Sequence, residues 1–221
     1  LITPRSIRKP TRRSASAWIS RHTGNGARTI SSLLCVICAS GRKTSASCGS
    51  PSAADARGLL GVVYTMMREH EKGIAELEKA IALNPNMADN HADFGYVLHL
   101  NGRNKEALLE IKKAIRLNPF PENMYFMYLG HAYMYEGVLD ESIAAYKKSL
   151  RIEPNNLFAH LRLAAVYSLL GYKDAAHTEA AEVLRINPKF SLEYFAATLP
   201  HKNQKKLDEY INALRKAGLP E

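Results

Sequence analysis

The residues best suited to metal chemistry are three cysteines and a histidine near the start of the chain. Cys35 and Cys38 are separated by two residues, the spacing of half a zinc site, and Cys48 and His22 lie in the same region. A structural zinc site needs a second pair of closely spaced ligands, and the interval from Cys38 to Cys48 does not supply one. We therefore expect no zinc site here.

The chain contains none of the motifs that usually carry catalysis. It has no P-loop, no glycine-rich dinucleotide-binding turn, no H-E-x-x-H pair and no G-x-S-x-G turn. His99 and His131 could approach each other, but two histidines without a nearby carboxylate make a poor metal site. The sequence therefore predicts a non-enzymatic protein with no cofactor and no metal.

Five prolines divide most of the chain into segments of nearly equal length. Pro51, Pro85, Pro119, Pro154 and Pro188 follow one another at intervals of 34, 34, 35 and 34 residues. The last four close the related phrases IALNP, IRLNP, LRIEP and LRINP. Self-similarity at a fixed period of this length indicates a repeat protein. We therefore expect stacked copies of one supersecondary unit.

Each unit carries apolar residues at helical spacing in two segments, with a short polar break between them. The first segment holds a small residue 24 positions before the closing proline, at Gly61, Gly95, Gly130 or Ala164. A small side chain lets a neighbouring backbone approach closely. Proline then ends the second segment, because it cannot continue a helix. Each unit is therefore expected to be a helical hairpin.

These landmarks resemble the tetratricopeptide repeat (TPR), a helix-turn-helix unit. The resemblance covers four units in register, residues 54–87, 88–121, 123–156 and 157–190, with His91 and His160 where the family often has tryptophan. It implies an all-α fold, a right-handed α-solenoid of four repeats closed by C-terminal capping helices. Residues 191–221 supply this helical cap, with Leu207, Tyr210, Ile211 and Leu214 on one face of its second helix.

In this family the first helices of the repeats line a concave groove. The resemblance places ten side chains there: Tyr96, His99, Leu100, Met124, Met127, His131, Met134, Tyr135, Phe158 and Leu161. Methionine and aromatic surfaces adapt to irregular apolar partners, so we expect a protein partner that presents a peptide or an amphipathic helix. The alternative interpretation is that several of these residues are core, because such stripes at helical spacing are more often buried than binding.

A narrower resemblance lies in residues 186–221 and in the phrase NPFPENMYFMYLGHAYMYEGVLDESIAAYKKSL. Both are similar to the C-terminal TPR segment of bacterial class III adenylate/guanylate cyclase-type proteins. The similarity implies an alternative function, in which this chain is the regulatory segment of a cytoplasmic signalling protein whose catalytic domain lies upstream.

Residues 1–53 differ chemically from the remainder. They contain nine Lys or Arg and no Asp or Glu, so the net charge of +9 belongs to this leader. Low hydrophobicity with high charge predicts disorder. Because Pro51 keeps the phase of the repeats, we interpret the leader as a preceding repeat read out of frame. Two alternatives are an organelle transit segment and a basic tail that binds nucleic acid without sequence preference.

No window approaches the 18 consecutive apolar residues that a transmembrane helix requires. We therefore expect a cytoplasmic chain with a protein or peptide partner, no specific nucleic acid and no membrane contact. The sequence leaves the oligomeric state open.

Overall fold

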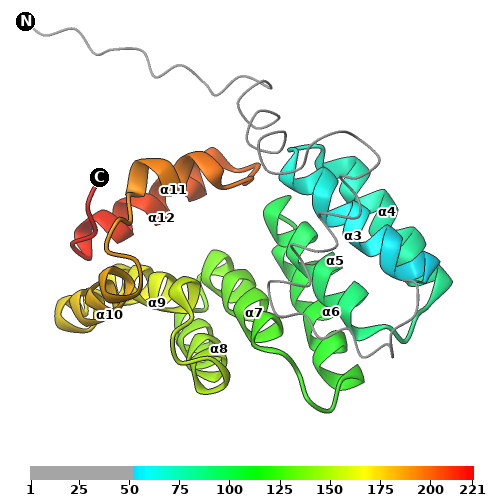
Figure 1. Ribbon diagram of the computed structural model, residues 1–221, viewed down its shortest axis with the longest axis horizontal. Helices are drawn as coiled ribbons and strands as arrows, with labels where there is room; N and C mark the ends of the chain where they lie inside the picture. Colours follow the sequence, from blue (N-terminus) through cyan, green and yellow to red (C-terminus); the bar gives the residue numbers. More distant parts are fainter. Residues whose placement is uncertain (1–51) are drawn as a thin grey trace, which may run out of the picture. The chain divides into compact units, whose positions relative to one another are not determined.

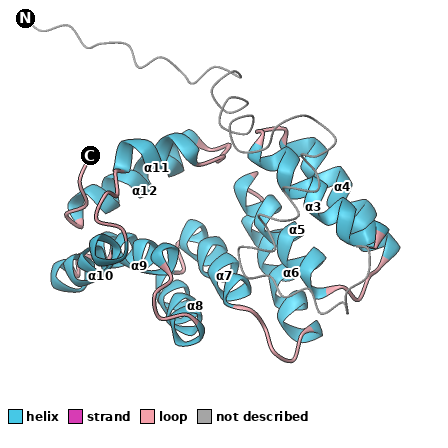
Figure 2. Cartoon of the chain, viewed as in Figure 1, coloured by secondary structure: helices cyan, strands magenta, loops and turns pink. Residues whose placement is uncertain are grey.

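The computed structural model describes residues 52–221, and every regular element in this range is a helix (Figure 2). The leader and its cysteines lie outside the described residues, apart from Ser52 and Ala53. Ser52 caps the first described helix: its hydroxyl accepts a hydrogen bond from the Asp55 amide, and the Asp55 carboxylate accepts one from the Ser52 amide. This reciprocal capping box fixes the start of the helix Ala53–Met66.

Eight helices form four hairpins that follow one another along the chain (Figure 1). They pair as α3 (Ala53–Met66) with α4 (His70–Leu83), α5 (Ala88–Leu100) with α6 (Asn104–Leu117), α7 (Asn123–Glu136) with α8 (Leu139–Ile152), and α9 (Leu157–Leu169) with α10 (Lys173–Ile186). Gly102, Gly137 and Gly171 occupy equivalent turn positions with φ near +80°, a conformation that favours glycine. Arg68 takes the same left-handed position in the first hairpin, with a φ of 64°.

The small residues of the first helices allow each hairpin to close. A Cβ added to Gly95 would lie 2.4 Å from Cγ1 of Ile111, and one added to Gly130 would lie 2.5 Å from the Tyr146 ring. The second helix therefore packs directly on the backbone of the first, as the sequence pattern predicts.

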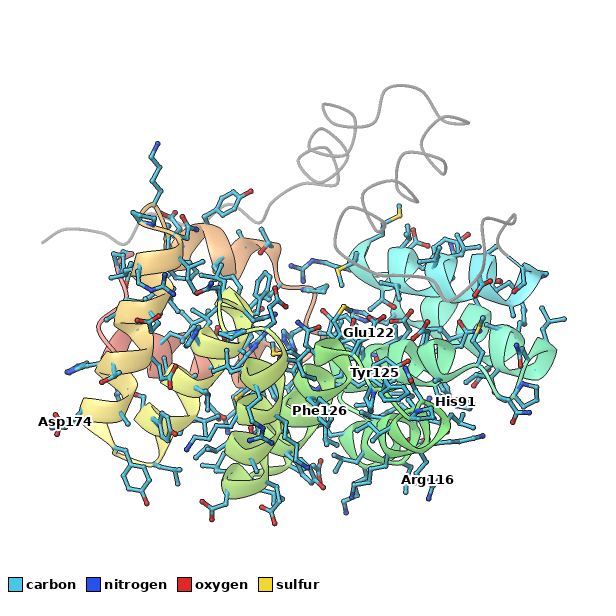
Figure 3. The ribbon with its side chains drawn as sticks, turned by 60° about the horizontal axis from the view of Figure 1, so that its bottom comes forward. His91, Arg116, Glu122, Tyr125, Phe126 and Asp174 are labelled. Carbon is cyan, nitrogen blue, oxygen red and sulfur yellow. The ribbon has the colours of Figure 1, made fainter. Side chains whose placement is uncertain are left out.

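Two buried histidines, one in the second hairpin and one in the fourth, form hydrogen bonds with the proline turn that precedes their own hairpin. Nδ1 of His91 lies 2.6 Å from a carboxylate oxygen of Glu110, and its Nε2 lies 2.8 Å from the carbonyl oxygen of Pro85 (Figure 3 labels His91). The same contacts recur two repeats later among His160, Glu179 and Pro154. Because a carbonyl only accepts, Nε2 donates in both cases.

Successive first helices contact one another, α3 with α5, α5 with α7 and α7 with α9, while each second helix also packs on the first helix of the next hairpin. The chain then turns back, so that α12 (Gln204–Lys216) packs on α9 and on the short helix α11 (Leu192–Thr198) (Figure 1). Ser191 and Asn203 cap these two helices, as their side chains accept from backbone amides.

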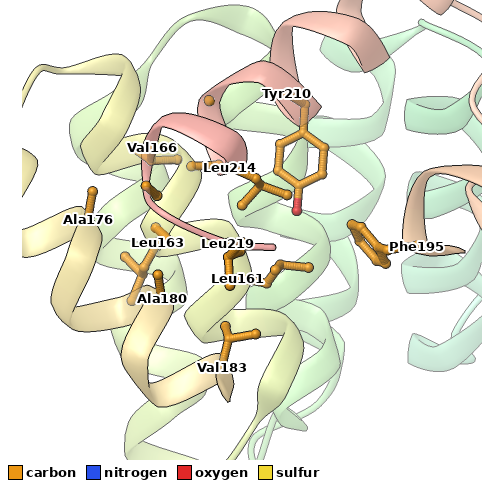
Figure 4. Packing of buried hydrophobic residues seen from close by; sticks show 14 of the residues in the cluster. Leu161, Leu163, Val166, Ala176, Ala180, Val183, Phe195, Tyr210, Leu214 and Leu219 are labelled. Carbon is orange, nitrogen blue, oxygen red and sulfur yellow. The ribbon is translucent and has the colours of Figure 1, made fainter. Parts of the chain in front are cut away.

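The helix α12 buries one face against α9. Tyr210 and Leu214 of α12, followed by Leu219, lie opposite Leu161 and Val166 of α9 (Figure 4). The predicted fold class, an all-α solenoid of four hairpins with capping helices, is confirmed. Within residues 52–221, no helix combines the length and the apolar character needed to cross a lipid bilayer.

Candidate binding surface

Ring contacts between α5 and α7 join four of the ten predicted groove residues: Tyr96, His99, His131 and Tyr135. Tyr96 of α5 stacks on Tyr128 of α7 with ring centroids 4.4 Å apart. His99 lies 5.6 Å from His131 and 4.7 Å from Tyr135, again between ring centroids. The sequence expectation that His99 and His131 approach each other thus agrees with the structure.

These predicted residues differ widely in exposure. Six of them are buried: His99, Leu100, Met127, His131, Met134 and Leu161. Tyr96, Met124 and Tyr135 are half-buried. Phe158, at the start of α9, is the exposed member, with 52% of its surface accessible. Met124 stands 34 positions earlier, at the equivalent place in α7.

The buried members are covered in part by the chain itself. Between α11 and α12, residues 199–203 form a short non-helical segment, and Leu199, Pro200 and His201 within it are all buried. The His201 ring stacks on Tyr135 at 5.1 Å and 6°, and meets His99 edge-on at 5.3 Å. We call residues 199–203 the crossing segment, because it joins the last hairpin's cap to the first two hairpins.

Two hydrogen bonds and one ion pair hold the crossing segment against the first two hairpins. The Lys202 amide donates to the carbonyl oxygen of Leu100 at 3.1 Å, where α5 ends. The Arg68 guanidinium donates to the Leu199 carbonyl oxygen at 3.0 Å. The Lys202 ammonium forms an exposed ion pair with Glu71 at 3.1 Å. Residues 131 positions apart in sequence are therefore in direct contact.

Arg162 of α9 lies beneath the capping helices, with 5% of its surface accessible. Its guanidinium lies 4.3 Å from the Tyr210 ring centroid and 6.0 Å from that of Phe195, both within cation–π range. Its Nε and Nη1 are buried without a hydrogen-bond partner, and no ion pair to Arg162 occurs among the described residues. The cap thus covers a charge mainly with aromatic rings.

The surroundings keep the buried imidazoles neutral. Burial lowers the pKa of His99 to about 4, although its hydrogen bond with Asn104 opposes this shift. Burial, together with the neighbouring His99 and the positive charge of Arg162, lowers the pKa of His201 to about 2. The pKa of His131 falls well below its ordinary value for the same leading reason, burial. The site therefore has no protonated histidine at neutral pH.

The arrangement brings imidazole and aromatic rings together between α5 and α7. Among residues 52–221, no group of three His, Cys, Asp or Glu side chains is placed to hold a metal ion. His99 and His131 are buried and Tyr135 is half-buried, and their flat rings suit contact with another ring, as His201 supplies.

Sequence reasoning missed three residues of this surface: His201, Arg162 and Arg68. Arg162 could have been identified from the sequence, because it is the only Lys, Arg, Asp or Glu in the mostly apolar helix LFAHLRLAAVYSL. His201 had none, since a Pro-His-Lys loop normally indicates a solvent-exposed connection.

Family profiles match two parts of the chain: a tetratricopeptide repeat at residues 54–87 and a TPR repeat at residues 130–171. No curated protein sequence matches the chain.

Several solved structures have the same fold. PilW, a type IV pilus biogenesis factor, is 15% identical with a TM-score of 0.61, over 93% of this chain and 84% of PilW. TTC0263, a TPR protein of the thermophile Thermus thermophilus, is 22% identical with a TM-score of 0.58, over 75% of this chain and 90% of TTC0263. YrrB, a TPR protein described as having an unusual peptide-binding site, is 19% identical with a TM-score of 0.51, over 74% of this chain and 84% of YrrB.

The chain therefore contains tetratricopeptide repeats, matched at residues 54–87 and 130–171. Its described residues form a solenoid of the tetratricopeptide type.

Proposed function

We propose that this chain is a non-enzymatic protein-binding module whose partner, a peptide or a helix, contacts the concave surface formed by α5, α7 and α9. The observation that carries the proposal is the accessible apolar pair Met124 and Phe158. They occupy equivalent positions in neighbouring first helices, where Phe158 is 52% exposed and Met124 is half-buried. Aligned apolar side chains of this kind are typical anchors for a partner.

The fold comparisons support this class of function without identifying the partner. TPR solenoids in general present extended concave surfaces for binding. YrrB, which shares the fold, is described as having a peptide-binding site. The cyclase-associated and nucleic-acid-binding alternatives remain predictions from the sequence, because no feature of residues 52–221 bears on them.

A capture experiment with matched variants tests the proposal. Phe158→Glu places a charge on the exposed anchor, whereas Leu109→Glu changes a side chain that is 69% exposed on the second helix α6. We expect proteins captured by the full chain to be retained by Leu109→Glu and reduced at least tenfold by Phe158→Glu. Far-ultraviolet circular dichroism should show the same helix content in all three. Equal capture by both variants would exclude a partner site at Phe158.

A further inference from the structure

We propose that the crossing segment, residues 199–203, is a resident and displaceable ligand of the concave surface, and that a partner peptide of the same chemistry takes its place. This inference rests on the proposed function, because it states how the same surface becomes available. It also names the kind of partner that fits: an extended peptide with a proline followed by an aromatic or imidazole ring.

The contacts of the crossing segment are those of a bound peptide. One ring, that of His201, packs against the rings of both Tyr135 and His99, which also contact each other. One backbone amide, that of Lys202, donates to the free carbonyl of Leu100 at the end of α5, a helix end that lacks an intrahelical partner. A ring in a pocket together with main-chain hydrogen bonds is the usual way in which an extended peptide is recognised.

Proline fits this mode of binding for a simple reason. Pro200 is buried and has no amide hydrogen, so its burial leaves no unsatisfied donor. The carbonyl of the residue before it, Leu199, is satisfied by Arg68. A partner with the same order of groups would keep these hydrogen bonds and would place its own ring on Tyr135.

The cap has anchors other than the crossing segment, of which only Leu199 shares the buried cluster of α11 and α12. The helix α12 is anchored to α9 by its own apolar face, including Leu207 and Leu214. The chain end holds α11 separately, since the Leu192 amide donates to the Pro220 carbonyl oxygen at 2.9 Å. At its outer edge the segment depends on the pair of Lys202 and Glu71, whose side chains are 56% and 76% exposed. Exposed ion pairs contribute little to stability.

The test uses the full chain and a peptide copied from it. A fluorescein-labelled peptide of residues 195–206 is titrated with the wild-type chain, with His201→Ala, and with Leu109→Ala as the matched surface control. Binding is followed by fluorescence anisotropy. We expect the peptide to bind His201→Ala at least tenfold more tightly than either other chain, because the tethered competitor is weakened. A peptide in which His201 is replaced by Ala should bind at least tenfold more weakly.

Two results would overturn the proposal. One is equal affinity of the peptide for all three chains, or no binding to any of them. The other comes from hydrogen exchange on the wild-type chain, which requires no variant to fold. A displaceable segment predicts that the Lys202 amide exchanges at least tenfold faster than the amides in the middle of α5. Equal protection would make the segment a fixed part of the fold. Either failure leaves the Phe158 capture experiment unaffected, so the two proposals are tested separately.

Discussion

Acidification is expected to destabilise the solenoid, because three neutral imidazoles are buried side by side in its concave surface. Burial holds the pKa of His99 at about 4 and that of His201 at about 2, and keeps the pKa of His131 well below 6.5. In the unfolded chain all three have an ordinary pKa near 6.5. Below that pH the unfolded state binds more protons than the native state. The free energy of unfolding therefore keeps its full value above pH 6.5 and decreases as the pH falls below it.

The size of the effect follows from the number of protons. Each pH unit changes the free energy of unfolding by about 1.4 kcal/mol for each proton that only the unfolded state binds. Between pH 6.5 and pH 5, one such histidine therefore costs about 2 kcal/mol, so His99 and His201 together cost about 4 kcal/mol, and His131 acts in the same direction. A typical domain has only about 5–15 kcal/mol of stability. Arg162 strengthens the effect, because its charge lies near all three rings and disfavours their protonation.

Urea unfolding followed by far-ultraviolet circular dichroism between pH 7.5 and pH 5 measures this dependence. In His201→Gln the loss of stability between pH 7.5 and pH 5 should be smaller by about 2 kcal/mol, since one buried imidazole that only the unfolded state protonates is gone. His177→Gln, at an exposed position on α10, should retain the full decrease. Wild-type stability that changes by less than about 1 kcal/mol over this range would show that the imidazoles are not buried as described.

Three further substitutions test the packing. Gly130→Ala should destabilise by about 1–3 kcal/mol in urea unfolding, because the new Cβ would lie 2.5 Å from the Tyr146 ring; an unchanged midpoint would contradict the hairpin geometry. Arg162→Met should leave the melting temperature unchanged or raise it, since it removes a buried charge that has no ion pair; a large loss of stability would mean that the charge has a partner. Glu110→Ala should cost about 1–3 kcal/mol by leaving Nδ1 of buried His91 unpaired, and a loss below about 0.5 kcal/mol would argue against that contact.

Much of the fold could be predicted because it is encoded locally. The proline period marks the repeat boundaries, the glycines at 102 and 171 mark turns that need a positive φ, and Ser191 and Asn203 mark helix starts. Each of these signals depends on residues within one or two turns of each other. The helical periodicity of the cap likewise predicts that Tyr210 and Leu214 share a buried face, as they do.

The state of the concave surface could not be predicted in the same way. Contact between the crossing segment and the first two hairpins depends on the curvature accumulated over four repeats, which no local pattern encodes. The family resemblance places Met127 and Leu161 in the groove by register alone, and both lie in the buried cluster with the cap residues. Register determines which way a side chain points, whereas the path of residues 199–203 determines what covers it.

The most direct test of the account is the contact between His201 and Tyr135. Nuclear Overhauser effects between the imidazole protons of His201 and the ring protons of Tyr135, in a selectively labelled full chain at pH 7.5, report on it without any substitution. With ring centroids 5.1 Å apart and nearly parallel planes, we predict clear cross-peaks and His201 resonances shifted by the aromatic ring. His201 resonances at random-coil positions, with no cross-peak to Tyr135 or His99, would contradict the closed concave surface.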